Sequence, residues 1–155
     1  MSLSSVQDHL SVYGAKDRIL IFPASSATVE LAAKEIGCDP SLICKTMAFA
    51  LGERTLIIPM AGDARIDNRK FKDQFHAKAK MLKGEEVSER TSHPIGGVCP
   101  FGLKEGCEVY LDESLKRFDY VYPACGSPNS AIRLTIVEME QFTGNPQWID
   151  VTKTD

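Results

Sequence analysis

The sequence has no apolar run approaching the roughly 20 residues that cross a bilayer. Its N-terminus shows no cationic start followed by an apolar stretch, so we expect neither a membrane span nor a secretory signal. The five cysteines are odd in number and never occur as Cys-x-x-Cys, which argues against a disulfide framework and against a zinc site. Reduced thiols in a cytoplasmic protein are the simple interpretation.

The sequence also lacks an excess of positive charge and contains little histidine. Its net charge of -3 argues against a broad nucleic-acid-coating surface, although a local basic patch is still possible. No two His, Cys, Asp or Glu residues show a recognisable ligand spacing, so we expect no metal and no other cofactor. His9 and His76 fall on predicted helices and are expected at the surface. His93 is the only plausible acid-base histidine, but a loop histidine without a role is the favoured interpretation.

The composition is that of one compact domain covering residues 1–155. Hydrophobic residues make up 43% and charged residues 25%, and there is no internal repeat or linker. Apolar periodicity and turn residues predict mixed α and β structure. Helices are predicted at 4–14, 28–36, 67–78, 85–91 and 137–142, and strands at 18–22, 43–51, 55–60, 107–111, 119–124 and 131–136. The tail up to Asp155 is expected to be peripheral.

The strand predicted at residues 43–51 carries one lysine among large apolar side chains. Side chains alternate between the two faces of a strand, so Lys45 shares its face with Ile43, Met47 and other apolar residues. An ammonium in that position needs an anionic partner, a route to the rim of the sheet, or a lowered pKa. Taken alone, the strand slightly favours a lysine that simply reaches water.

Residues 64–83 are strongly basic for an acidic protein. Seven Lys or Arg residues stand against two Asp residues, a local excess of 7 − 2 = +5. The basic residues are Arg65, Arg69, Lys70, Lys72, Lys78, Lys80 and Lys83. A solvated helix face and a landing surface for phosphates are equally good interpretations of this segment.

Two glycine-containing loops suggest chemistry performed by the backbone. In the segment 94–102, glycine and proline alternate closely, and the turn at Gly126 and Ser127 offers a second backbone approach with a hydroxyl. Successive N–H groups in such loops suit a polarised carbonyl or a phosphate oxygen, but two ordinary tight turns would look the same. Cys99 could act as a nucleophile, although a packing role is clearly favoured.

Five elements occur together in order: Ile43-Cys44-Lys45-Thr46, Gly62-Asp63-Ala64-Arg65-Ile66-Asp67, the run from Ile95 to Gly102, Leu111-Asp112-Glu113-Ser114-Leu115, and Gly126-Ser127. This ordered set resembles the YbaK/ProX family of aminoacyl-tRNA editing domains over about residues 25–144. The resemblance implies a mixed α+β fold with a curved, mixed or mostly antiparallel central sheet flanked by helices. It also implies hydrolysis of the ester that joins a wrong amino acid to tRNA.

The resemblance assigns roles to particular residues. Lys45 matches the essential lysine near the terminal adenosine and the ester, and Gly96 and Pro100 end the loop whose backbone positions the ester carbonyl. Expected catalytic residues are Lys45, Gly96 and Ser127. Expected substrate-binding residues are Gly97, Val98, Cys99, Pro100, Asp112 and Gly126, with Asp112 equally suited to a structural cap. Expected tRNA-binding residues are Arg65, Arg69, Lys70 and Lys72.

Two further functions compete with a freestanding aminoacyl-tRNA deacylase. One is a catalytically silent module that binds tRNA or a partner such as a synthetase, and the other is thiol chemistry at Cys99. Editing is needed where a synthetase pocket rejects a smaller or isosteric amino acid only weakly. Family members differ in whether they remove cysteine, alanine, or serine and threonine, and this sequence leaves the amino acid, the tRNA and the oligomeric state open.

Overall fold

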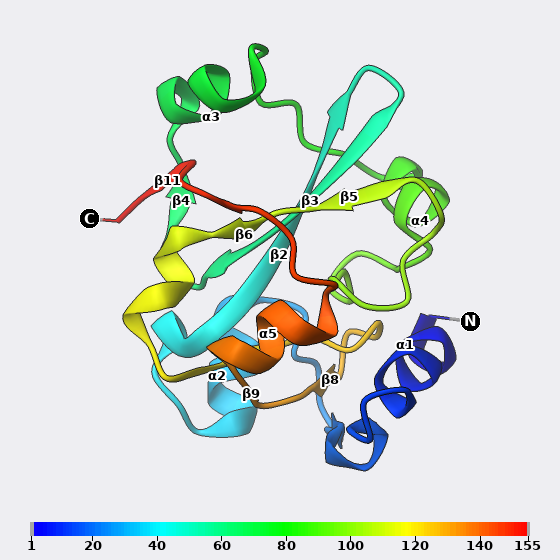
Figure 1. The fold of residues 1–155 in the computed structure, drawn as a ribbon. Helices are drawn as coiled ribbons and strands as arrows, with labels where there is room; N and C mark the ends of the chain where they lie inside the picture. The colour runs from blue at the N-terminus through cyan, green and yellow to red at the C-terminus, as the bar shows by residue number, and fades with distance from the viewer. Residues whose placement is uncertain (1, 155) are drawn as a thin grey trace.

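A computed structural model describes residues 2–154 as an α+β fold around a five-stranded sheet (Figure 1). The α-helices are α1 (Ser2–Ser11), α2 (Val29–Ile36), α3 (Asn68–Phe75), α4 (Glu85–Thr91) and α5 (Ile136–Phe142). Short 3-10 helices are η1 (Lys16–Arg18), η2 (Pro40–Leu42) and η3 (Glu113–Arg117). None of the helices within residues 2–154 combines the length and apolar character that crossing a bilayer requires.

The main sheet is mixed. In spatial order it contains β5 (Cys107–Val109), β3 (Arg54–Ala61), β2 (Ile43–Leu51), β7 (Tyr120–Pro123) and β9 (Leu134–Thr135). The β2–β3 and β7–β9 pairs are antiparallel, whereas β2–β7 and β3–β5 are parallel. Three further strand pairs are β1 (Leu20–Ile21) with β8 (Ser130–Ala131), β4 (Arg65–Ile66) with β11 (Thr152–Lys153), and β6 (Leu111–Asp112) with β10 (Trp148–Ile149). The predicted class, a curved mixed sheet flanked by helices, is confirmed.

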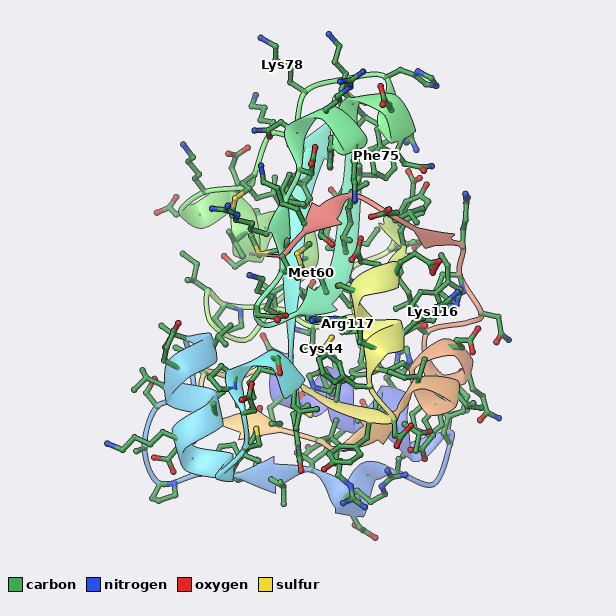
Figure 2. The ribbon with its side chains drawn as sticks, turned by 90° about the vertical axis from the view of Figure 1, so that its left-hand side faces the viewer. Cys44, Met60, Phe75, Lys78, Lys116 and Arg117 are labelled. Atoms are coloured by element: carbon green, nitrogen blue, oxygen red, sulfur yellow. The ribbon has the colours of Figure 1, made fainter. Side chains whose placement is uncertain are left out.

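The β2–β3 hairpin is buried on both faces, as its two-sided apolar sequence predicts. On one face, Phe49 and Ile58 pack in a cluster with Phe71 of α3. On the other, Ala48 and Ile57 pack with side chains from α4 and the segment before it. Figure 2 shows the hairpin rising through the molecule, with α2 and α5 on opposite sides of its base and α3 at its tip.

Local capping explains where two helices begin and end. The Thr28 hydroxyl accepts the Leu31 N–H at 3.2 Å before α2, and Gly37 ends that helix with a φ of 82°. Asp67 accepts backbone N–H bonds before α3, and α3 ends at Phe75 because His76 adopts the left-handed conformation. The predicted end near Lys78 is therefore too late.

Several further predictions differ from the structure, and the strand predicted at 107–111 is divided between β5 and β6. The first helix spans Ser2–Ser11 rather than residues 4–14, and the strand predicted at 131–136 is divided between β8 and β9. The expectation of a peripheral tail is wrong, because β10 and β11 pair with β6 and β4. Ile149 and Val151 are 3% and 0% exposed and belong to the core cluster around Phe71.

Candidate functional site

A pocket of about 390 Å³ opens beside the first half of β2. Its size suits one small ligand or the end of a larger one. The floor is formed by β2, and the walls come from the segment before α2, from α2 itself, from the segment before α4, from the glycine loop and from β7. The lining residues with polar side chains are Ser26, Thr28, Lys45, Thr46, Lys83, Tyr122 and Ser130, together with the Cys44 thiol.

Lys45 is half-buried at this pocket and is not free in bulk water. Its Nζ donates a 3.4 Å hydrogen bond to the carbonyl of Gly62, the residue that follows β3. Within residues 2–154, no carboxylate lies within ion-pair distance of that amine. The nearby Asp63 is instead held by Arg117 through both of its carboxylate oxygens. An ammonium with one long neutral hydrogen bond retains capacity for an anionic or carbonyl ligand.

Burial determines the electrostatics of Lys45. Removal of water around the ammonium lowers its pKa, and the carboxylates of Asp63 and Glu30 oppose that effect without cancelling it. A bound anion would offset the cost of desolvating the ammonium, because it would supply the negative charge with which Lys45 is not paired in the protein. The amine is therefore suited to binding a phosphate or a developing oxyanion.

The two glycine loops touch each other through their backbones. Gly96 lines the pocket with a φ of 86°, and a Cβ there would lie 2.8 Å from the Ala27 Cβ. At Gly97, a Cβ would lie 2.7 Å from the Ser127 nitrogen and 2.8 Å from the Gly126 carbonyl carbon. Only glycine allows these main chains to approach so closely. The segments around Gly97 and Ser127 are thus brought together directly behind one wall of the pocket.

Helix α1 supports both loops from behind. A Cβ at Gly126 would lie 2.7 Å from the Ser2 carbonyl oxygen, and one at Gly102 would lie 2.7 Å from the Ser5 carbonyl oxygen. His9 of the same helix accepts the Gly102 N–H at 3.1 Å through Nδ1, and its Nε2 lies 2.7 Å from the Phe142 carbonyl oxygen. His9 is therefore a partly buried structural residue, contrary to the predicted surface position, whereas His76 is exposed as expected.

His93 and Cys99 lie behind the loop, out of reach of the pocket. Both side chains are 0% exposed, and the His93 Nε2 lies 2.7 Å from the Phe101 carbonyl oxygen. Desolvation lowers the pKa of His93, and the hydrogen bond to Phe101 only partly offsets this. Burial raises the pKa of the Cys99 thiol to about 12. A neutral buried imidazole and an un-ionised thiol favour packing over acid-base or thiol chemistry.

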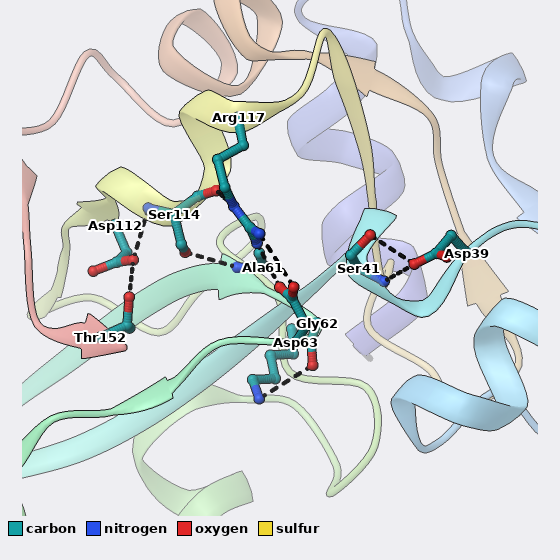
Figure 3. Close-up of polar contacts among 10 residues, drawn as sticks. Asp39, Ser41, Ala61, Gly62, Asp63, Asp112, Ser114, Arg117 and Thr152 are labelled. Carbon is teal, nitrogen blue, oxygen red and sulfur yellow. Dashed lines mark hydrogen bonds and ion pairs between the residues drawn. The ribbon is translucent and has the colours of Figure 1, made fainter. Parts of the chain in front are cut away.

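Ser127 and Asp112 make internal hydrogen bonds. The Ser127 hydroxyl donates to Ser130 Oγ at 2.7 Å and lies 3.0 Å from Asn129 Oδ1, so it braces its own turn. Asp112 is 0% exposed and accepts bonds from the backbone N–H groups of Ser114 and Val151 and from the Thr152 hydroxyl. Figure 3 shows the Ser114 and Thr152 contacts. For Asp112, this geometry favours the structural cap over the substrate contact.

The predicted site residues are thus brought together only in part. Lys45, Gly96 and Val98 line the pocket, and Gly97, Gly126 and Ser127 meet directly behind its wall. Pro100 is buried beyond the pocket with Cys99. The structure adds lining residues that the sequence pattern did not indicate, notably Thr46, Tyr122 and the segment 81–84.

The basic segment separates into two parts. On α3, Lys70 makes an ion pair with Asp150 and donates to the Thr152 carbonyl, while Arg69 and Lys72 are exposed. After α3, the chain runs along the edge of β2, where Lys83 reaches the mouth of the pocket. Lys78 lies near the tip of the hairpin, far up the molecule from Cys44 at the base of β2 (Figure 2). Arg65 lies on β4 and is exposed.

Comparison with known proteins points to one family. The family described as "Aminoacyl-tRNA editing domain" matches residues 24–142. Over 99% of its length, the chain is 51% identical to the uncharacterized protein YwhH of Bacillus subtilis, covering 98% of that protein. It is 26% identical to the proline–tRNA ligase of Bacillus cytotoxicus over 83% of its own length, but spans only 22% of that ligase.

Solved structures agree with this grouping. A structure described as a candidate trans-editing enzyme for prolyl tRNA synthetase superposes with a TM-score of 0.87 at 30% identity, covering 98% of this chain and 97% of the other. The hypothetical protein APE2540 superposes with a TM-score of 0.86 at 26% identity, covering 96% and 99% of the two chains.

Proposed function

This chain belongs to the family of aminoacyl-tRNA editing domains, and on that premise we propose that it deacylates mischarged tRNA in trans. The observation that carries the proposal is the pocket that joins a half-buried, unpaired Lys45 to the Gly96 backbone. The proposed substrate is a prolyl-type or related tRNA that bears a small wrong amino acid. The similarity to proline–tRNA ligases supports that choice of tRNA. A cytoplasmic location, where charged tRNA is used, completes the proposal.

The proposed reaction is hydrolysis of the ester by water. The oxygen of water bonds to the acyl carbon, the bond from that carbon to the ribose oxygen breaks, and the ribose oxygen takes up a proton. Lys45 binds a phosphate or the carbonyl oxygen of the acylated adenosine. Backbone N–H groups of the loop at Gly96 to Pro100 orient the ester, and the Gly126–Ser127 turn fixes that loop through Gly97.

The attacking water needs a base, and none is evident in the pocket lining. Among its lining residues within 2–154 there is no His, Asp or Glu. We propose that a ribose hydroxyl of the substrate activates the water. The same observation favours the competing candidate, a catalytically silent module that binds tRNA or a synthetase.

The test is a deacylation screen over mischarged tRNAs with Lys45→Ala. We expect hydrolysis by the native protein and a loss of at least about 100-fold in kcat/KM for the variant, the scale for removing a preorganised electrostatic contact. Folding should be unaffected, because the removed cation is desolvated and has no ion pair. Lys16→Ala, at an exposed position of η1, is the matched control. Binding without hydrolysis of any tRNA would establish the silent module instead.

We propose that the tRNA lies over the exposed basic side chains between α3 and the pocket. Arg65, Arg69, Lys70 and Lys72 form the proposed phosphate surface. Lys70 already makes an ion pair with Asp150, so its charge is less available to a phosphate than that of an unpaired lysine. Charge reversal of Arg69 and Lys72 should weaken binding and flatten its salt dependence. An unchanged affinity and slope would show that these residues form only a solvated face.

A further inference from the structure

Strand pairing along the edge of β2 that faces away from β3 is interrupted. Near its start, Ile43 and Cys44 pair with β7. Farther along, Phe49 pairs with Met81 from the segment that follows α3. Between these two partners, residues 45–47 have no strand on this edge within the part of the chain that the structure describes. The interruption spans about 10 Å, at roughly 3.3 Å per residue.

The hydrogen bonds beside the interruption show which main-chain groups are left unpaired. The Ala50 N–H donates to Lys80 at 2.8 Å, and the Ala48 carbonyl accepts from Leu82 at 3.0 Å. The main-chain groups of Ala48 and Ala50 therefore point to the edge of β2 that faces away from β3, whereas those of the neighbouring residues point to β3. Because this direction alternates along a strand, the N–H and the carbonyl of Thr46 point to the open edge as well.

This open edge lies inside the pocket. Residues Cys44 to Ala48 form the floor, Tyr122 and Ala124 stand on the β7 side, and Met81 and Leu82 stand on the opposite side. An unpaired strand edge is a template for an extended backbone. The pocket here has a volume of about 390 Å³, a size that suits one small ligand better than a strand of many residues. An aminoacyl group, with an amine donor and a carbonyl acceptor on either side of one Cα, is the smallest unit that matches.

We propose that the main chain of Thr46 is the α-amino subsite of the pocket. Its carbonyl accepts a hydrogen bond from the α-amino group of the acyl ester, which is a donor whether protonated or neutral. The Thr46 side-chain oxygen is buried and has no hydrogen-bond partner within residues 2–154, so the proposal assigns the contact to the main-chain carbonyl, which points to the open edge. The side chain of the amino acid then faces apolar wall residues such as Val29, Ala32 and Val98. The proposal rests on the proposed function and defines its substrate class as esters of L-amino acids with a free α-amino group.

The proposal separates recognition of the backbone from recognition of the side chain. A subsite built from main-chain atoms binds the α-amino group, which all amino acids have. The apolar wall then limits only the size of the side chain. Lys45 and the glycine loop stay available for the phosphate and the ester. Acyl groups without an amine should therefore be poor ligands even when their size and shape fit.

The test uses non-hydrolysable adenosines that carry an acyl group in amide linkage at the 3′ position. Three probes are compared by titration with backbone amide NMR: L-alanyl, D-alanyl and propionyl. We expect propionyl to bind about 10- to 100-fold more weakly than L-alanyl, the scale for a lost hydrogen bond to a group that can be charged. The Thr46 and Ala48 amide resonances should shift with L-alanyl, and D-alanyl should bind less tightly.

Equal affinity for the propionyl and L-alanyl probes, or unshifted Thr46 and Ala48 resonances on saturation, would overturn the subsite. The readout is binding, so it does not depend on turnover. A parallel deacylation assay with alanyl-tRNA reports on the proposed function separately. Selective binding of L-alanyl without hydrolysis would support the subsite while refuting the deacylase.

Discussion

Replacing Gly97 by alanine tests whether the contact between the two glycine loops builds the site. The backbone of Gly97 is not in the left-handed region, so alanine can adopt it without conformational strain. The cost is purely steric. The new Cβ would lie 2.7 Å from the Ser127 nitrogen, whereas ordinary contacts begin near 3.4 Å, so the loops must separate by about 0.7 Å. Both partners are main-chain atoms and cannot rotate away.

Overpacking of this kind costs about 1–3 kcal/mol of unfolding free energy. A displacement approaching 1 Å in a reacting group can cost about 100-fold in rate. We therefore expect kcat/KM for deacylation to fall by roughly 10- to 100-fold, by more than the loss of folded protein explains. Urea unfolding and steady-state deacylation of the same preparations measure the two effects.

Gly106→Ala is the matched control. Gly106 has a φ of 97°, and no atom lies within 4 Å of the position that a Cβ would occupy there, so its substitution strains the backbone without touching the pocket. It should lower stability by about 1–3 kcal/mol and leave kcat/KM unchanged. If Gly97→Ala were destabilised to the same degree but hydrolysed its substrate at the native rate, the loop contact would not matter for the site.

Three further predictions concern charged groups. Burial lowers the pKa of Lys45 below its ordinary 10.5, so kcat/KM, corrected for hydrolysis by the buffer, should fall as the pH rises and the amine loses its proton. Lys45→Arg should shift this alkaline fall in kcat/KM to higher pH. A fall that does not shift would contradict the role of the amine. Asp112→Asn should cost about 1–3 kcal/mol in urea unfolding, because an amide cannot accept all the bonds of the carboxylate, while a loss of kcat at unchanged stability would restore the substrate role. Arg18 lowers the pKa of Glu138 to about 2 from 4.5, so this partly exposed pair should contribute about 1 kcal/mol above pH 4.5 and lose it as the pH falls toward 2. The stability difference between the native protein and Arg18→Ala should therefore shrink in acid, and a difference that stays constant would exclude the linkage.

Local sequence signals predicted the elements that carry the site. The strand 43–51 has the predicted bounds, since two-sided apolar alternation between turn residues is a strong signal. The helices predicted to begin at 28 and 67 do start there, at the N-cap residues Thr28 and Asp67, because N-capping is a local property. The sequence places Lys45 as a cation on an apolar face of its strand, and in the structure it lies half-buried at a pocket.

Long-range pairing could not be predicted in the same way. The strands of the tail are two residues long, too short for periodicity. Val151 lies in the core cluster around Phe71, and its N–H is bound by Asp112, 39 residues earlier. Likewise, nothing local shows that Lys70 would be paired with Asp150 or that Met81 would lie beside Phe49. The open edge at Thr46 depends on that last pairing and is invisible in the sequence.

The seating of Gly102 and Gly126 against helix α1 has a mechanical consequence. At both points main chain lies against main chain, and at Gly126 the Val6 side chain also packs 2.9 Å from the position of a Cβ. A tilt of this helix would therefore displace the backbone of both loops. The helix lies ahead of the residues that match the family, so the rigidity of both loops depends on a segment outside that match.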